Sequence, residues 1–236
     1  MKVIENLSFY FANSFTVDML LQIIETFSDD FRKLAAETLT YMLRNERQAH
    51  DILRLFKELG GCEKLIGLMT STQSVTVRAR LLVCFQTITS SEDQDVLAEL
   101  KDLNLVPIML QLIVAIMAPE SETQADTPGV LGSILTTLTN LSLNDANNVK
   151  IRLHGAHIIG SLLMENCPQL NRDNPKVYVS GDAGENLKVQ HELQMHCLRC
   201  LRFLYSVEKN RKAFKVIFPP SIFGAFIDVG NYNKDF

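Results

Sequence analysis

The chain contains four copies of one helical phrase: AAETLTYM (35–42), LLVCFQTI (81–88), ILTTLTNL (134–141) and CLRCLRFL (197–204). Each copy begins with small or aliphatic residues and then places two apolar residues three positions apart. Positions i and i+3 lie on the same face of a helix, so we expect these pairs to be buried. The expected core pairs are Leu39/Met42, Phe85/Ile88, Leu138/Leu141 and Leu201/Leu204.

A second apolar run follows each phrase after about 20 residues. These runs are GGCEKLIGLM (60–69), NLVPIMLQLI (104–113), HGAHIIGSLL (154–163) and FPPSIFGAFI (218–227). A helical unit that repeats at roughly 45 residues is typical of a solenoid, in which stacked units bury a continuous core. Solenoids mostly bind partners, so the pattern indicates a binding protein more than an enzyme.

Composition excludes several function classes. The net charge of −4 argues against a nucleic-acid partner, because that binding needs clustered cationic surface. The most apolar window, 105–118, contains Pro107 and Gln111 and falls short of the ~20 residues that span a bilayer. We therefore expect a buried core helix there, and no membrane partner. No secretion signal is visible, and five scattered cysteines suit reduced thiols in the cytoplasm or nucleus.

The phrases divide the chain into one solenoid over 1–236. We predict a partial repeat, four full repeats and two inserted polar loops, with a turn at LNDANN (143–148) inside the third full repeat. Gly60-Gly61 should interrupt the first full repeat, and the acidic segment SSEDQ (90–94) should cap the helix that follows it. The predicted ranges are 16–28 for the partial repeat, 29–73, 74–117, 129–164 and 188–228 for the full repeats, and 118–128 and 165–187 for the loops.

Two residue clusters could suggest chemistry. Cys197 and Cys200, flanked by His191 and His196, invite a metal interpretation, but zinc needs four convergent ligands and no second pair is evident. Both cysteines occupy core positions of the fourth phrase, which favours packing. An enzyme or metal protein using this region remains a rival hypothesis.

His154 and His157 could suggest a catalytic base. We place them at a helix junction, where no motif supplies a nucleophile, and expect a structural or solvent-facing role. We therefore predict no catalytic residue, no cofactor and no metal in this chain.

The segment TLTNLSLNDANNVKIRLHGAHIIGSLL (137–163) resembles an armadillo repeat, and NLVPIMLQLI (104–113) resembles the second half of one. The resemblance extends over about 16–228. It implies an all-α, right-handed superhelical solenoid of about four repeats plus a partial N-terminal one.

The C-terminal segment EKNRKAFKVIFPPSIFGAFIDVGNY (208–232) resembles the armadillo-type stretch that precedes a kinase domain in the NIMA-related serine/threonine kinase family. The resemblance implies a regulatory fragment or truncated isoform, an attached kinase domain as partner, and a cell-cycle or ciliary context. The chain itself contains no glycine-rich phosphate loop, V-A-I-K, H-R-D or D-F-G motif, so we do not expect it to be an enzyme. A free-standing armadillo adaptor without a kinase parent is the alternative.

The armadillo resemblance also implies a concave groove that binds a protein or extended peptide. The groove-facing positions are the phrase's asparagine and the residue four before it. They map to Glu37, Tyr41, Val83, Thr87, Thr136, Asn140, Arg199 and Phe203. Only Asn140 keeps the family's asparagine, which argues against binding of basic nuclear-localisation peptides. Alternatively, Val83 and Phe203 are partly buried between neighbouring repeats.

Overall fold

A computed structural model of the chain describes residues 13–45, 48–91, 93–118, 127–142, 145–166 and 183–217. Every secondary-structure element in these ranges is an α-helix, so the all-α prediction is confirmed for the described residues. The chain divides into two compact units, 1–105 and 106–236.

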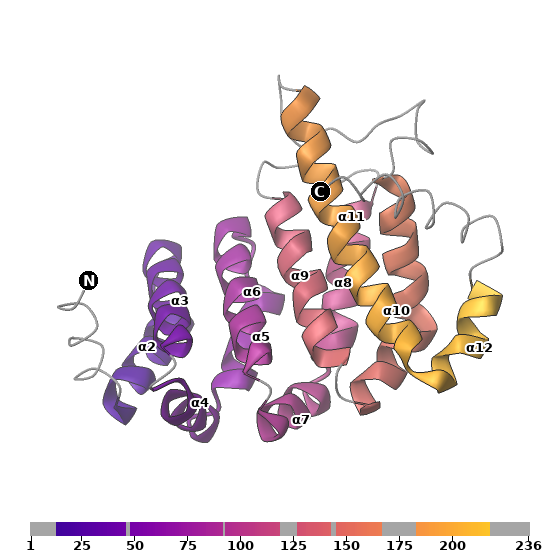
Figure 1. The fold of residues 1–236 in the computed structure, drawn as a ribbon. Coiled ribbons are helices and arrows are strands. Elements are labelled where there is room, and N and C mark those ends of the chain that lie inside the picture. The colour runs from indigo at the N-terminus through magenta and orange to yellow at the C-terminus, as the bar shows by residue number, and fades with distance from the viewer. Residues whose placement is uncertain are drawn as a thin grey trace. The chain divides into compact units, whose positions relative to one another are not determined.

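Unit 1 is built from pairs of neighbouring helices (Figure 1). Helix α3 packs against α6 on one side and against α2 on another, and α2 also contacts α4 and α5. The helices are α2 (Ser14–Thr26), α3 (Asp29–Arg44), α4 (Ala49–Glu58), α5 (Gly61–Ser71), α6 (Val75–Ser90) and α7 (Gln94–Asp102).

Short polar side chains start three of these helices, because their oxygens satisfy backbone N–H groups that have no partner inside the helix. Asn13 Oδ1 accepts from the Thr16 N–H at 2.9 Å, and Ser74 Oγ accepts from the Val77 N–H at 3.3 Å. Asp93 Oδ1 accepts from the first turn of α7, which confirms the cap predicted at SSEDQ.

The predicted break at Gly60-Gly61 is also confirmed. Gly60 has φ +69°, a left-handed conformation that glycine adopts without steric cost. Gly60 thus lies in the short joint between the end of α4 at Glu58 and the start of α5 at Gly61.

The contact between α3 and α6 forms part of the core of unit 1. All four predicted anchors in these helices are buried: Leu39, Met42, Phe85 and Ile88. Burial of such side chains contributes roughly 1.5–3 kcal/mol each to folding. The repeated phrase therefore supplies the contact layer of this unit.

Unit 2 contains longer helices. Helix α9 packs against α11, and α10 packs against α9, α11 and α12. The anchors Leu138, Leu141, Leu201 and Leu204 are all buried, so the core prediction holds in this unit as well. The helices are α8 (Leu105–Met117), α9 (Thr127–Ser142), α10 (Asp145–Glu165), α11 (Ala183–Ser206) and α12 (Glu208–Ile217).

One helix in unit 2 corrects the sequence prediction. We expected a turn at 143–148 and a helix junction at His154 and His157, but α10 runs without interruption from Asp145 to Glu165. The segment 145–154 contains neither glycine nor proline. Asparagine and aspartate cost at most about 0.7 kcal/mol per helical position, so they do not stop a helix that packs against α9, α11 and α12.

Helix α8 confirms the predicted core helix at 105–118. Its residues Leu105, Val106, Met109 and Ile113 are buried, whereas Val114 is exposed. Among the described residues, no single helix is long and apolar enough to cross a membrane.

Several predicted segments lie largely or wholly outside the described residues. These include most of the two inserted loops at 118–128 and 165–187 and the C-terminal segment from 218 onward. Helix α11 begins at Ala183, within the second predicted loop. The division into repeats remains a prediction.

Candidate functional site

In unit 1, the predicted groove residues Glu37 and Tyr41 lie on α3, and Val83 and Thr87 lie on α6. Glu37 Oε1 forms an ion pair with Arg80 Nε at 2.8 Å, which joins the two helices on this face. Tyr41 is 73% exposed, while Val83 and Thr87 are partly exposed. The structure therefore brings these four residues onto neighbouring, solvent-accessible helix surfaces.

The hydroxyl of Thr87 donates to the Val83 carbonyl at 3.0 Å, one turn back in the same helix. Threonine commonly makes this bond inside helices. The Thr87 hydroxyl therefore donates its proton within the protein and not to a partner.

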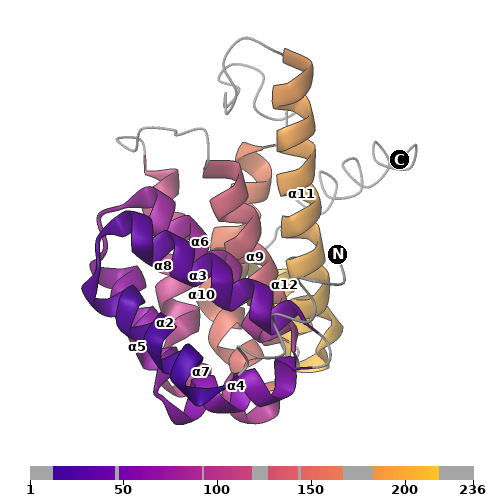
Figure 2. The same ribbon diagram turned by 90° about the vertical axis from the view of Figure 1, so that its left-hand side faces the viewer.

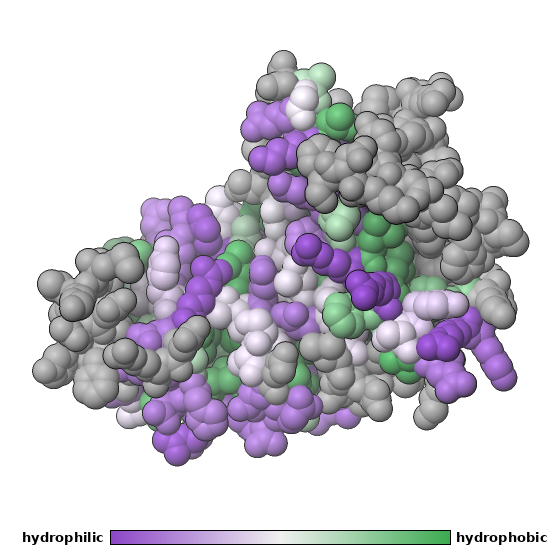
Figure 3. Space-filling model, viewed as in Figure 1, coloured by the Kyte–Doolittle hydropathy of each residue, from purple (hydrophilic) through white to green (hydrophobic). Residues whose placement is uncertain are grey.

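In unit 2, Thr136 and Asn140 lie on α9, and Arg199 and Phe203 lie on α11. Thr136 and Asn140 are partly exposed, and Arg199 is exposed. Phe203 is 40% exposed. On the side that faces the viewer in Figure 3, α9 and α11 carry both hydrophilic and hydrophobic residues. Such a mixed surface suits a partner with polar and apolar groups.

His196 connects the two helices of this face. Its Nδ1 lies 3.3 Å from Thr136 Oγ1, and its ring lies over Gly132, where an added Cβ would be 3.5 Å from Nε2. Thr136 donates its hydroxyl proton to the Gly132 carbonyl at 2.8 Å. The arrangement therefore fits the tautomer in which His196 Nδ1 donates to Thr136.

Burial lowers the pKa of His196 below its usual value of 6.5, and the nearby Arg199 charge lowers it further, while Glu192 opposes both. The unfolded chain then binds a proton at a higher pH than the folded chain. Stability is fully present above the unfolded pKa and decreases as pH falls below it.

We expect the His196→Gln variant to lose part of the acid sensitivity of the wild type. Glutamine cannot bind the proton, so the free energy of unfolding should decline less between neutral and mildly acidic pH. Urea titrations of both proteins across this pH range measure the difference. If the free energy of unfolding fell equally with pH in both proteins, His196 would not be a source of the acid sensitivity.

None of the eight predicted groove residues is buried. Val83 is partly buried, as the alternative interpretation expects, and Phe203 keeps a substantial exposed area. Sequence reasoning did not predict that Arg80 and His196 link neighbouring helices on the two faces. Their partners, Glu37 and Thr136, are far away along the chain, so no local pattern could reveal these contacts.

The cysteines of the fourth phrase are core residues. Cys197 and Cys200 are fully buried, and burial raises the pKa of both thiols, for Cys200 to about 12. The predicted packing role is confirmed. Within the described residues, no group of three or more His, Cys, Asp or Glu side chains could hold a metal.

His157 is exposed on α10, and its Nδ1 lies 3.3 Å from Ser161 Oγ. The side chain of His154 lies outside the described set. The location of both residues inside one helix corrects their predicted place at a junction.

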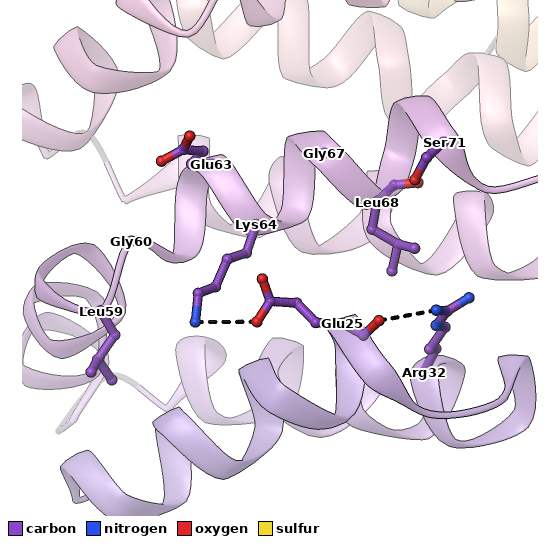
Figure 4. Close-up of a pocket in the computed structure, with 9 residues that line it drawn as sticks. All are labelled: Glu25, Arg32, Leu59, Gly60, Glu63, Lys64, Gly67, Leu68 and Ser71. Carbon is purple, nitrogen blue, oxygen red and sulfur yellow. Dashed lines mark hydrogen bonds and ion pairs between the residues drawn. The ribbon is translucent and has the colours of Figure 1, made fainter.

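An open pocket of about 650 Å³ lies in unit 1 and was not anticipated from the sequence. Lys64 Nζ pairs with Glu25 Oε2 at 3.3 Å, and Arg32 Nη2 donates to the Glu25 carbonyl at 3.0 Å (Figure 4). Lys64, Glu25 and Arg32 therefore already have partners within the protein. The lining residues are Glu25, Arg32, Leu59, Gly60, Glu63, Lys64, Gly67, Leu68 and Ser71.

The described residues form an all-α protein. The helix faces on α3, α6, α9 and α11 carry both polar and apolar side chains, and no catalytic centre is evident among the described residues. No family profile matches the sequence, and no solved structure matches it. The informative similarities are to protein kinases.

The chain is 31% identical over 144 residues to the mouse (Mus musculus) serine/threonine-protein kinase Nek10, covering 61% of this chain and 12% of that kinase. It is 32% identical over 115 residues to human (Homo sapiens) Nek10, covering 48% of this chain and 8% of the relative. It is 27% identical over 224 residues to the Caenorhabditis elegans serine/threonine-protein kinase D1044.8, covering 94% of this chain and 21% of the relative. The matched region is thus a small part of each kinase's length.

Proposed function

We propose that this chain is an armadillo-type protein-binding region of a NIMA-related serine/threonine kinase. One observation carries the proposal: similarity to a kinase covers 94% of this chain but only 21% of that kinase, and the chain contains no phosphate loop or H-R-D and D-F-G motif. Phosphoryl transfer needs those groups. The similar region therefore has a role other than the chemistry.

The packing of the repeated phrases supports the armadillo-type solenoid. Their anchors are buried throughout, and phrase-bearing helices pack against each other in both units, α3 on α6 and α9 on α11. We infer that the full chain continues this stacking into a right-handed superhelix. Its role would be to scaffold or regulate an attached kinase domain, in the cytoplasm or nucleus and in a cell-cycle or ciliary setting.

The proposed partner is a protein or peptide that binds the exposed faces of the phrase helices. Tyr41 and Phe203 offer aromatic area, and Arg199 offers a cation. Aromatic and arginine side chains contribute most of the binding energy in many interfaces. The lack of an asparagine series disfavours basic nuclear-localisation peptides.

We expect the double variant Arg199→Glu, Phe203→Ala to lose most of its partners in a pull-down or proximity-labelling experiment. Loss of one aromatic or arginine anchor typically costs about 2 kcal/mol or more, and roughly 30-fold in affinity follows from that value. The measurement is partner recovery, quantified against wild type in the same cells.

Leu187→Ala on the same helix is the matched control, because Leu187 is also exposed but is not one of the groove positions. It should keep the wild-type set of partners. If the double variant also keeps that set, the face is not the binding site.

An open reading frame that continues beyond Phe236 into a glycine-rich kinase strand would support the kinase parent, and one without it would favour a free-standing adaptor.

A further inference from the structure

Helix α3 carries a row of large apolar side chains on its exposed surface. Phe31, Leu34 and Tyr41 are 55%, 59% and 73% exposed, and Thr38 completes the row. The spacing of three and four residues is that of a coiled-coil contact stripe. Phe27, just before α3, extends the row by an edge contact with Phe31 at 5.9 Å between ring centroids.

The middle of this stripe, Leu34 and Thr38, lies on the side of α3 opposite to its buried residues. Ala36 and Thr40 are buried, and each lies on the opposite side of the helix from Thr38, since two residues correspond to about 200° of helical rotation. Figure 2 shows α3 in front of α6 within unit 1. Exposed apolar stripes of this kind mark association surfaces.

Charged residues stand beside both ends of the stripe. Asp30 lies in the first turn of α3 and Arg44 is its last residue. Both side chains are exposed, and neither takes part in the ion pairs found among the described residues. Glu37 lies between them and is already paired with Arg80 at 2.8 Å.

We propose that α3 pairs in antiparallel orientation with α3 of a second copy of this chain. Around a two-fold axis near residue 36, Phe31 of one copy meets Tyr41 of the other, and Leu34 meets Thr38. The same pairing places Asp30 of each copy within one helical turn of Arg44 of its partner. It also sets the positive end of one helix dipole against the negative end of the other.

The self-complementary pattern favours a second copy over an unlike partner. A two-fold interface requires the same surface to match itself. The stripe has an aromatic residue at each end, and its two flanking charges have opposite sign. The only charge at the centre, Glu37, is neutralised within its own chain, so its approach to its symmetry mate is not repulsive. This inference goes beyond the proposed function and does not depend on it. The dimer would cover Tyr41 and leave Arg199 and Phe203 of unit 2 to the proposed partner.

Light-scattering mass measurement on the full chain tests the pairing. At micromolar concentration we expect about twice the monomer mass of 26.6 kDa. Asp30→Arg and Arg44→Asp should each shift the protein to monomer, because each juxtaposes like charges. The combined variant Asp30→Arg, Arg44→Asp should restore the dimer, since opposite charges meet again. Leu34→Asp should give monomer in any charge background.

Asp51→Arg is the matched control: the same charge change in the first turn of α4, on another exposed residue. It should leave the dimer intact, and circular dichroism should show all variants folded. A wild type that stays monomeric would overturn the proposal, as would a double charge swap that fails to restore the dimer. A dimer unaffected by Leu34→Asp would place the contact elsewhere and would also overturn it.

Discussion

The Phe85→Ala variant is expected to lose about 3–5 kcal/mol of unfolding free energy, because it removes a buried ring and leaves a cavity. Phe85 is fully buried in α6, the helix that packs on α3. Small domains are stable by only about 5–15 kcal/mol, so a substantial fraction of the variant should unfold under mild denaturant. Urea titration followed by circular dichroism gives the change directly.

Phe15→Ala is the control within the same unit. Phe15 is 75% exposed, so its truncation should change stability by less than about 0.5 kcal/mol, as for other surface positions. Equal losses for the two variants would mean that Phe85 does not belong to the core as the structure places it.

The second large effect is expected from Gly61→Ala at the start of α5. An added Cβ would overlap the ring of Phe56, and Phe56 is fully buried and cannot move freely. Overpacking of this kind costs about 1–3 kcal/mol. We therefore expect a clear decrease in the urea midpoint.

Gly67→Ala in the same helix should have the opposite effect. Apart from its chain neighbours and the backbone of its own helix, no atom lies within 4 Å of the position of its added Cβ, and Gly67 lies in the helix interior. Alanine there should stabilise by about 0.5–1 kcal/mol. A loss of stability in both variants would indicate that α5 is sensitive to any substitution, and the packing explanation for Gly61 would be wrong.

Local sequence patterns were sufficient to find the core. The pairs Leu39/Met42 and Leu201/Leu204 are buried because the helical period leaves few positions that can face a neighbouring helix. The break at Gly60 was predictable for a related reason: glycine adopts the left-handed conformation that the joint between α4 and α5 requires.

The sequence was less informative where polar residues occur inside helices. Asp145 and the asparagines after it resemble a turn, yet they belong to α10. Propensity differences of a few tenths of a kcal/mol are weak compared with the packing of α10 against α9, α11 and α12. A segment without glycine or proline can form either a turn or a continuous helix, and contacts with residues distant in sequence determine which one forms.

The candidate site shows the same division. The i, i+4 rule placed all eight residues on partly or fully exposed positions, because exposure follows from helical periodicity. The pairing of Glu37 with Arg80 and of Thr136 with His196 depends on which helices become neighbours. That information is not contained in any single segment. Whether these faces bind a partner remains a prediction.

The threonines of the candidate faces have a consequence for the chemistry of a partner. Thr87 and Thr136 each give their hydroxyl proton to a carbonyl of their own helix. What they can still offer outward is an oxygen lone pair, so toward a ligand they act as acceptors only. A segment rich in free N–H groups would find a matching acceptor on either face, whereas on α9 and α11 a segment that presents mainly carbonyl oxygens would depend on Arg199 for its donors.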